Sequence, residues 1–138
     1  MRPGPVTLLA AGLSALTVAG AAAHHSGAMY DRTKTVTVAG VVKEFDYVQP
    51  HSWIDLIAPG PKGEQVQWSF EGGTPGQMKS VGIAPSTLKV GDKVTIKGYP
   101  LRDGRNGGAF LEITLANGVV ASTGRKPTPP PPTPTVGP

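Results

Sequence analysis

Alternating apolar and polar residues divide the middle of the chain into short strands. Residues 35–45 alternate and are rich in β-branched side chains, which is the pattern of a half-buried strand. Gly40 in the middle of this run predicts a bulge or a sharp bend, as barrels use at their corners. The same alternation predicts four further strands, at residues 52–57, 64–70, 93–99 and 109–115.

The segments between these strands carry turn and helix signals. Turns are predicted at residues 59–63 (PGPKG) and at Asn117-Gly118. Thr74 followed by Pro75 predicts a capped helix that continues to about Val81. Five strands with one short helix between the third and the fourth is the order of an OB-fold barrel. We therefore predict an all-β fold, a small five-stranded OB-fold-like barrel.

The first 23 residues predict a secretory signal peptide. Arg2 precedes an apolar stretch over residues 6–18, and Ala21 and Ala23 supply the small side chains that signal peptidase requires. The apolar stretch is shorter than the roughly 20 residues of a membrane-spanning helix. We expect cleavage after Ala23, a periplasmic or secreted protein, and no membrane span after cleavage. Cleavage after Ala21 or Ala22, or an uncleaved anchor, are the alternatives.

Composition limits the mature chain to one small domain without disulfides. It has no cysteine, and the net charge of +4 falls to +3 without Arg2. The basic residues are spread along the chain, so we expect no nucleic-acid partner. Residues 122–138 (STGRKPTPPPPTPTVGP) are rich in proline and predict a disordered tail. The predicted organisation is an N-terminal arm at 24–33, the barrel at 34–121 and the tail at 122–138.

The three histidines of the chain suggest a metal site that needs no cysteine. Cleavage after Ala23 would make His24 the first residue, with an α-amine and an imidazole available as ligands. His51, directly before the second predicted strand, would supply another imidazole. Nitrogen ligands of this kind suit Cu(II), so copper is the expected metal. Glu71, at the end of the third strand, would be an axial ligand or a second-shell acceptor.

Two other interpretations of these histidines remain open. The α-amine, the next backbone nitrogen and the imidazole of His25 would also chelate Cu(II) locally, without His51. Alternatively, His24 and His25 are a disordered leader and His51 is an ordinary loop histidine.

Several short motifs occur in a characteristic order along the chain. They are His24-His25-Ser26, the segment 49–53 (QPHSW), the segment 68–72 (WSFEG), the segment 88–94 (LKVGDKV) and the segment 98–104 (GYPLRDG). Together they resemble the exported bacterial domain-of-unknown-function family 6152, from His24 to about Gly118. The resemblance implies export and the domain boundaries, and it implies no activity.

The second functional hypothesis is a metal-free binding or accessory module. OB barrels bind oligosaccharides or proteins over their second and third strands. Trp53 and Trp68 lie on these strands and would stack on a ligand if exposed, although their apolar neighbours favour burial of both. A periplasmic protein partner is the other ligand class expected. No arrangement of catalytic residues is recognisable, so we do not expect an enzyme.

Overall fold

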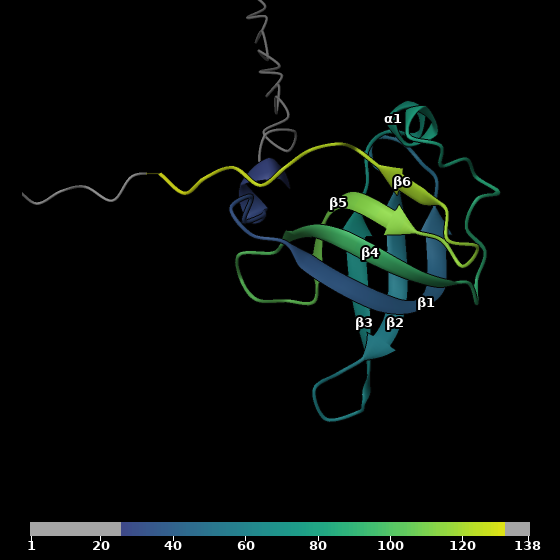
Figure 1. Ribbon diagram of the computed structural model, residues 1–138, viewed down its shortest axis with the longest axis horizontal. Helices are drawn as coiled ribbons and strands as arrows, with labels where there is room; N and C mark the ends of the chain where they lie inside the picture. The colour runs from purple at the N-terminus through teal and green to yellow at the C-terminus, as the bar shows by residue number, and fades with distance from the viewer. Residues whose placement is uncertain (1–25, 132–138) are drawn as a thin grey trace, which may run out of the picture.

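The computed structural model describes residues 26–131, which form a closed barrel with one helix (Figure 1). Its elements are η2 (Ser26–Met29), β1 (Val36–Asp46), β2 (Trp53–Pro59), β3 (Gln65–Glu71), α1 (Pro75–Ser80), β4 (Lys93–Pro100), β5 (Gly107–Thr114) and β6 (Val120–Ser122). The five predicted strands correspond to β1–β5, and each boundary lies within two residues of its predicted place. Within the described part of the chain, no helix is long and apolar enough to cross a membrane.

The strand order closes the sheet into a barrel. Antiparallel pairing runs through β3-β2-β1-β4-β5-β6, and a parallel pairing between β3 and β5 joins the two sides. The five-stranded barrel with a helix between β3 and β4 confirms the OB-like fold. β6, which pairs with the second half of β5, was not predicted. Three residues are too few to show a clear alternation.

The long strand β1 pairs with two neighbouring strands, β4 and β2, and it bends where the pairing changes from one to the other. Residues 36–41 pair with β4, and residues 41–46 pair with β2. The bend predicted at Gly40 falls at this transition. A Cβ atom on Gly40 would lie 2.7 Å from the Ile57 carbonyl oxygen, so the close strand approach requires glycine. The register irregularity itself lies slightly later, between Val42 and Glu44.

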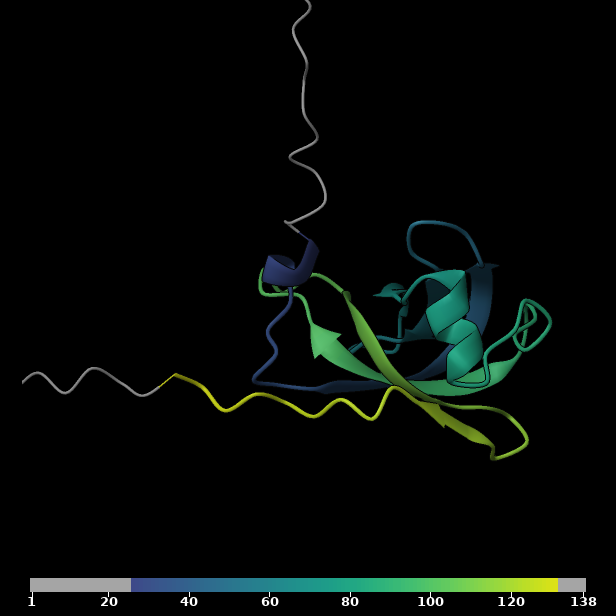
Figure 2. The ribbon, with the colours of Figure 1, turned by 90° about the horizontal axis from the view of Figure 1, so that it is seen from above.

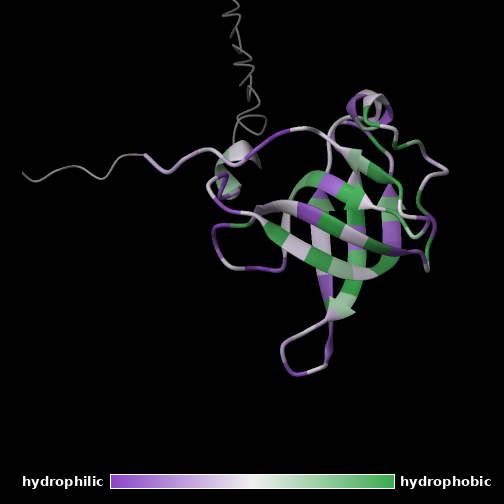
Figure 3. Cartoon of the chain, in the orientation of Figure 1, coloured by the Kyte–Doolittle hydropathy of each residue, from purple (hydrophilic) through white to green (hydrophobic). Residues whose placement is uncertain are grey.

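The core fills the barrel, and α1 covers one end of it (Figure 2). Ile54, Leu56, Phe70, Ile96 and Ile113 are fully buried, and they alternate with polar residues that face outward (Figure 3). The helix begins as predicted: the Thr74 hydroxyl accepts from the Gln77 amide, and the Gln77 side chain accepts from the Thr74 amide. Met78 is the buried residue of α1 and packs in the core.

The first residues of the expected tail lie against the barrel. Ser122 belongs to β6, and the Thr123 amide donates to the Leu111 carbonyl at 2.8 Å. Further along, the Tyr99 hydroxyl donates to the Lys126 carbonyl, and the Thr128 amide donates to the Arg32 carbonyl. Residues 123–128, which we call the C-terminal strap, thus run beside the barrel towards η2 (Figure 1). A disordered tail was predicted from residue 122 onward, so residues 122–128 correct that prediction: their hydrogen bonds are to distant residues, which no local pattern records.

Candidate functional site

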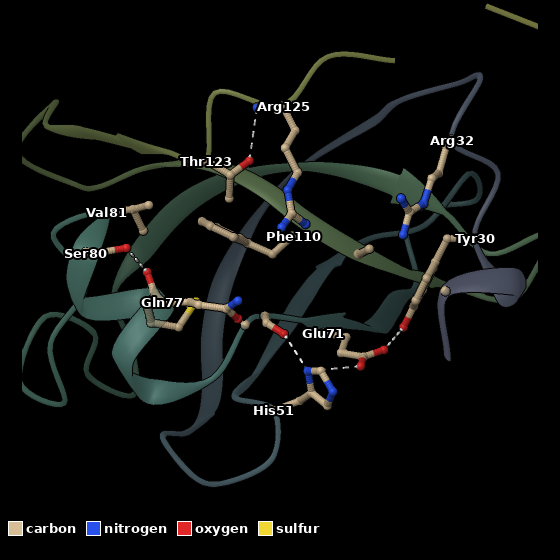
Figure 4. Close-up of a pocket in the computed structure, with 15 residues that line it drawn as sticks. Tyr30, Arg32, His51, Glu71, Gln77, Ser80, Val81, Phe110, Thr123 and Arg125 are labelled. Carbon is tan, nitrogen blue, oxygen red and sulfur yellow. Dashed lines mark hydrogen bonds and ion pairs between the residues drawn. The ribbon is translucent and has the colours of Figure 1, made fainter. Parts of the chain in front are cut away.

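A carboxylate at the end of β3 holds a tyrosine and a histidine from distant parts of the chain. The Tyr30 hydroxyl donates a hydrogen bond to Glu71 Oε2. His51 Nδ1 lies 3.5 Å from Glu71 Oε1 and 3.3 Å from the Gly72 carbonyl oxygen. The Glu71 side chain is only 9% exposed, whereas that of His51 is 42% exposed. The buried carboxylate therefore connects a buried phenol with a histidine that reaches solvent (Figure 4).

Backbone hydrogen bonds fix the histidine loop against the end of β3. The Ser52 amide donates to the Gly73 carbonyl, and the Gly72 amide donates to the Ser52 carbonyl. The Gln49-Pro50 peptide just before His51 is cis. A Cβ atom on Gly72 would lie 2.9 Å from Met78 Sδ, so a larger residue here would force the Met78 side chain to shift. These contacts give His51 a defined position although its ring is partly exposed.

Tyr30 is anchored by packing as well as by its hydrogen bond. Its ring is 4% exposed and packs with Tyr99 and Leu111 in a small second cluster. A bridge to Leu101 and the hydrogen bond from the Asp31 amide to the Pro100 carbonyl hold the backbone beside it. Burial and the hydrogen bond to Glu71 raise the pKa of the Tyr30 hydroxyl far above its usual range. The hydroxyl therefore stays protonated and keeps donating to the Glu71 carboxylate.

These side chains form one wall of a pocket with a volume of about 380 Å³. The pocket lies where β3 ends beside β5, between α1, the N-terminal arm and the C-terminal strap. Arg32 and Arg125 extend into it from the arm and the strap, opposite His51 and Glu71 (Figure 4). Met78, Val81 and Phe110 supply its apolar surface.

The structure brings together two of the four predicted metal ligands. His51 and Glu71 are neighbours, as their predicted positions at adjacent strand ends implied. His24 and His25 lie outside the described residues. Gly27, three residues after His24 in sequence, lines the same pocket as His51. Among residues 26–131, no three histidine, aspartate or glutamate side chains are close enough together to hold a metal.

The two tryptophans differ in their surroundings and do not form a shared surface. Trp53 is 38% exposed and lies opposite Glu71 on the outer face, so the expected burial of Trp53 was wrong. Trp68 pairs with buried Leu56, stacks on Phe70 with ring centroids 6.1 Å apart, and packs against the core. The first position of β2 lies on the outer face of the barrel and the fourth position of β3 on the inner face. Alternation predicts which residues share a face, but not which face is buried.

Among the pocket residues that sequence reasoning missed are Tyr30, Arg32 and Arg125. All three lie outside the alternating segments, in stretches that were assigned to an arm and a tail. An aromatic side chain within a short arm was a signal for Tyr30, because such a residue is usually packed against other residues. The two arginines resemble the other dispersed basic residues in sequence.

Comparison with known proteins gives a family and a structural neighbour. The model of a family of unknown function (DUF6152) matches residues 12–110. A comparison with curated proteins found no match. Among solved structures, the mitochondrial single-stranded DNA binding protein Rim1 from S. cerevisiae matches with 12% identity and a TM-score of 0.48. That match covers 61% of this chain and 94% of the Rim1 chain.

The family match extends over most of the chain and includes Tyr30, Arg32, His51, Glu71 and Gln77. It ends at Phe110, before β6 and the C-terminal strap. The resemblance inferred from the short motifs is thereby confirmed: this chain belongs to the family of unknown function DUF6152.

Proposed function

We propose that the mature protein is an exported barrel that binds Cu(II) through His24 and His51. In this proposal His24 contributes its α-amine and imidazole, and His51 contributes one ring nitrogen. Neutral imidazole and amine nitrogens suit copper, which has the highest affinity among the divalent first-row metals. The α-amine and the imidazole have ordinary pKa values of about 8 and 6.5, so both lose their protons readily for a metal at neutral pH.

The observation that carries the proposal is the orientation of His51. Its Nδ1 atom faces the Gly72 carbonyl and the Glu71 carboxylate, both of which are hydrogen-bond acceptors. This environment favours the tautomer with a proton on Nδ1 and a lone pair on Nε2. Histidine ligands of metals usually donate their second ring nitrogen to a carboxylate or a carbonyl in this way. Figure 4 shows these two contacts of His51 Nδ1 as dashed lines.

Glu71 takes the orienting role in this proposal and not that of an axial ligand. One of its oxygens accepts from Tyr30, and the other lies beside His51 Nδ1. The carboxylate would hold the imidazole in place and increase its basicity. Tyr30, in turn, would keep the carboxylate fixed.

The N-terminal arm supports the role of His24. Gly27 lines the pocket together with His51, and η2 is tied to the barrel by the hydrogen bond from the Arg102 amide to the Met29 carbonyl. The Arg102 guanidinium also donates to the Ala28 carbonyl. Three residues of extended chain span roughly 10 Å, so an N-terminus at His24 is within reach of this pocket.

Calorimetric titration of the exported protein with Cu(II) tests the proposal, after intact mass has shown that the chain begins at His24. We expect one equivalent of copper to bind. His24→Ala and His51→Ala should each weaken binding at least tenfold, and Glu71→Gln by about tenfold. His25→Ala is the matched control and should bind like the wild type.

The reverse pattern would refute this ligand set. If His25→Ala abolishes binding and His51→Ala leaves it unchanged, the copper is held by the local chelate at the N-terminus. A mature chain that begins before or after His24 would also contradict the proposal, because the α-amine would then belong to another residue.

The second candidate is a metal-free accessory module, and the exposure of Trp53 favours it. The indole lies on the outer face beside Asp55, which accepts hydrogen bonds from Ser69 and Gln67. An aromatic ring next to polar side chains suits an oligosaccharide or a protein surface. Titration with oligosaccharides, followed by the fluorescence of Trp53 and compared with Trp53→Phe, tests it. An unchanged spectrum throughout would exclude the sugars tested.

A further inference from the structure

Two arginines in the pocket have no acidic partner in the described structure. Among residues 26–131, the ion pairs are Lys34 with Asp31, His51 with Glu71, and Arg105 with Asp103. Neither Arg32 nor Arg125 takes part, although both line the pocket. Glu71 is the one acidic residue that lines it, and both of its oxygens already have partners. The pocket therefore has an excess of positive charge.

Both guanidinium groups extend from backbone that is held on each side. The Asp31 carboxylate accepts from the Thr33 amide and hydroxyl, which fixes the turn that carries Arg32. The Thr128 amide donates to the Arg32 carbonyl and joins this turn to the C-terminal strap. Within the strap, Thr123 Oγ1 accepts from the Arg125 amide, and the Tyr99 hydroxyl donates to the next residue, Lys126. The guanidinium groups of Arg32 and Arg125 thus come from two segments, the N-terminal arm and the C-terminal strap, that are hydrogen-bonded to each other.

The remaining lining is suited to an organic molecule. The partly exposed side chains of Val81 and Ala109 and the edges of the buried core residues Phe110 and Met78 form its apolar part, and Gln77 contributes a side-chain amide. A volume of about 380 Å³ lies at the small end of the range for ligand pockets, roughly 300–1,000 Å³. Planar guanidinium groups bind carboxylates through paired hydrogen bonds. The apolar part of the pocket would contribute binding free energy only to a ligand with carbon atoms that bury against it, and an inorganic ion has none.

We propose that this pocket binds a small organic carboxylate, with Arg32 and Arg125 as the groups that recognise its charge. The carboxylate end lies towards the two arginines, and the apolar part lies over Phe110 and Val81. This site does not depend on copper, because neither arginine is a metal ligand. The C-terminal strap is then part of the binding site and not merely a tail.

The test is an NMR titration of the metal-free protein with benzoate, and with neutral benzamide as the matched probe. Benzoate should shift the amide signals of Gly73, Thr123 and Arg125, and it should bind at least tenfold more tightly than benzamide. Arg32→Gln and Arg125→Gln should each weaken benzoate binding about tenfold, the size expected for one charge-assisted hydrogen bond. Lys62→Gln is the control, since it removes one positive charge in the distant β2–β3 turn.

Three results would overturn the proposal. Equal affinities for benzoate and benzamide would show that charge is not recognised. Equal effects of Lys62→Gln and the two arginine variants would indicate only long-range attraction. Inorganic phosphate that binds at least as tightly as benzoate would exclude an organic ligand. Because all titrations use metal-free protein, the outcome is separate from that of the copper experiment.

Discussion

Tyr30→Phe isolates the hydrogen bond that holds the Glu71 carboxylate. The phenylalanine ring retains the packing against Tyr99 and Leu111, so the variant loses only the hydroxyl donor. A hydrogen bond to a charged group contributes about 1.5–3 kcal/mol to stability. Glu71 would remain 9% exposed with His51 as its one side-chain partner, so we expect the upper half of that range.

Urea unfolding at pH 7, followed by tryptophan fluorescence, measures this loss. In a parallel thermal unfolding experiment, the same loss should lower the melting temperature of a domain of this size by about 10–20 °C. Tyr99→Phe is the matched control, because its hydroxyl donates to the neutral Lys126 carbonyl at 2.8 Å. The control should cost about 1 kcal/mol.

The pH dependence provides a second check with a defined sign. Folding raises the pKa of Tyr30, so above pH 10 the unfolded chain loses a proton that the folded chain retains. The contribution of the hydroxyl is therefore fully present below about pH 10 and decreases as the pH rises further. The stability difference between wild type and Tyr30→Phe should be constant from about pH 7 to 9 and smaller above pH 10. A loss below about 0.5 kcal/mol at pH 7, or a difference that grows above pH 10, would refute this account of Glu71.

Three further tests, two by substitution and one by truncation, concern the framework around the site. Gly98→Ala would place a Cβ atom 2.6 Å from the Ala109 carbonyl oxygen and should destabilise the barrel by about 1–3 kcal/mol. The matched control is Gly76→Ala in α1, where the nearest atom to the new Cβ would be 3.8 Å away. This control should stabilise the protein by about 0.5–1 kcal/mol. Thermal unfolding measures both, and equal effects would contradict the packing argument. Thr74→Ala removes the capping box of α1 and should cost about 1 kcal/mol, with Thr74→Ser largely neutral by the same measurement. A chain that ends at Gly124 loses the partners of Tyr99 and Arg32 and should unfold about 1–2 kcal/mol more easily; unchanged stability would mean that the strap is not held as described.

The strands could be predicted because their signal is local. In β2 and β3, and over most of β1 and β4, residues that face the core alternate with more exposed residues, and this alternation is visible within each segment. In β5 the buried residues Phe110 and Leu111 are adjacent. The start of α1 was equally clear, because Thr74 and Pro75 satisfy the first turn through neighbours in sequence. The face that each tryptophan occupies was harder to predict, since alternation groups side chains without saying which group lies inside.

The candidate site could be predicted only in part, for a physical reason. His51 and Glu71 were expected to be close because they lie at the ends of strands that pair with each other. Tyr30 reaches the same carboxylate across 41 residues. Such a contact depends on how the arm crosses the closed barrel, which no local pattern records.

The sequence by itself determined the order of the five main strands and the capped helix along the chain, and it was enough to identify the family. It also placed three histidines at the predicted cleavage point and before the second strand. These features follow from short-range periodicity and from backbone preferences that each segment carries alone. Only the tertiary structure decided that Glu71 orients His51, that Tyr30 holds Glu71, and that Arg32 and Arg125 share a pocket. Barrel closure between β3 and β5 and the docked strap bring these side chains together, and both depend on contacts between distant parts of the chain.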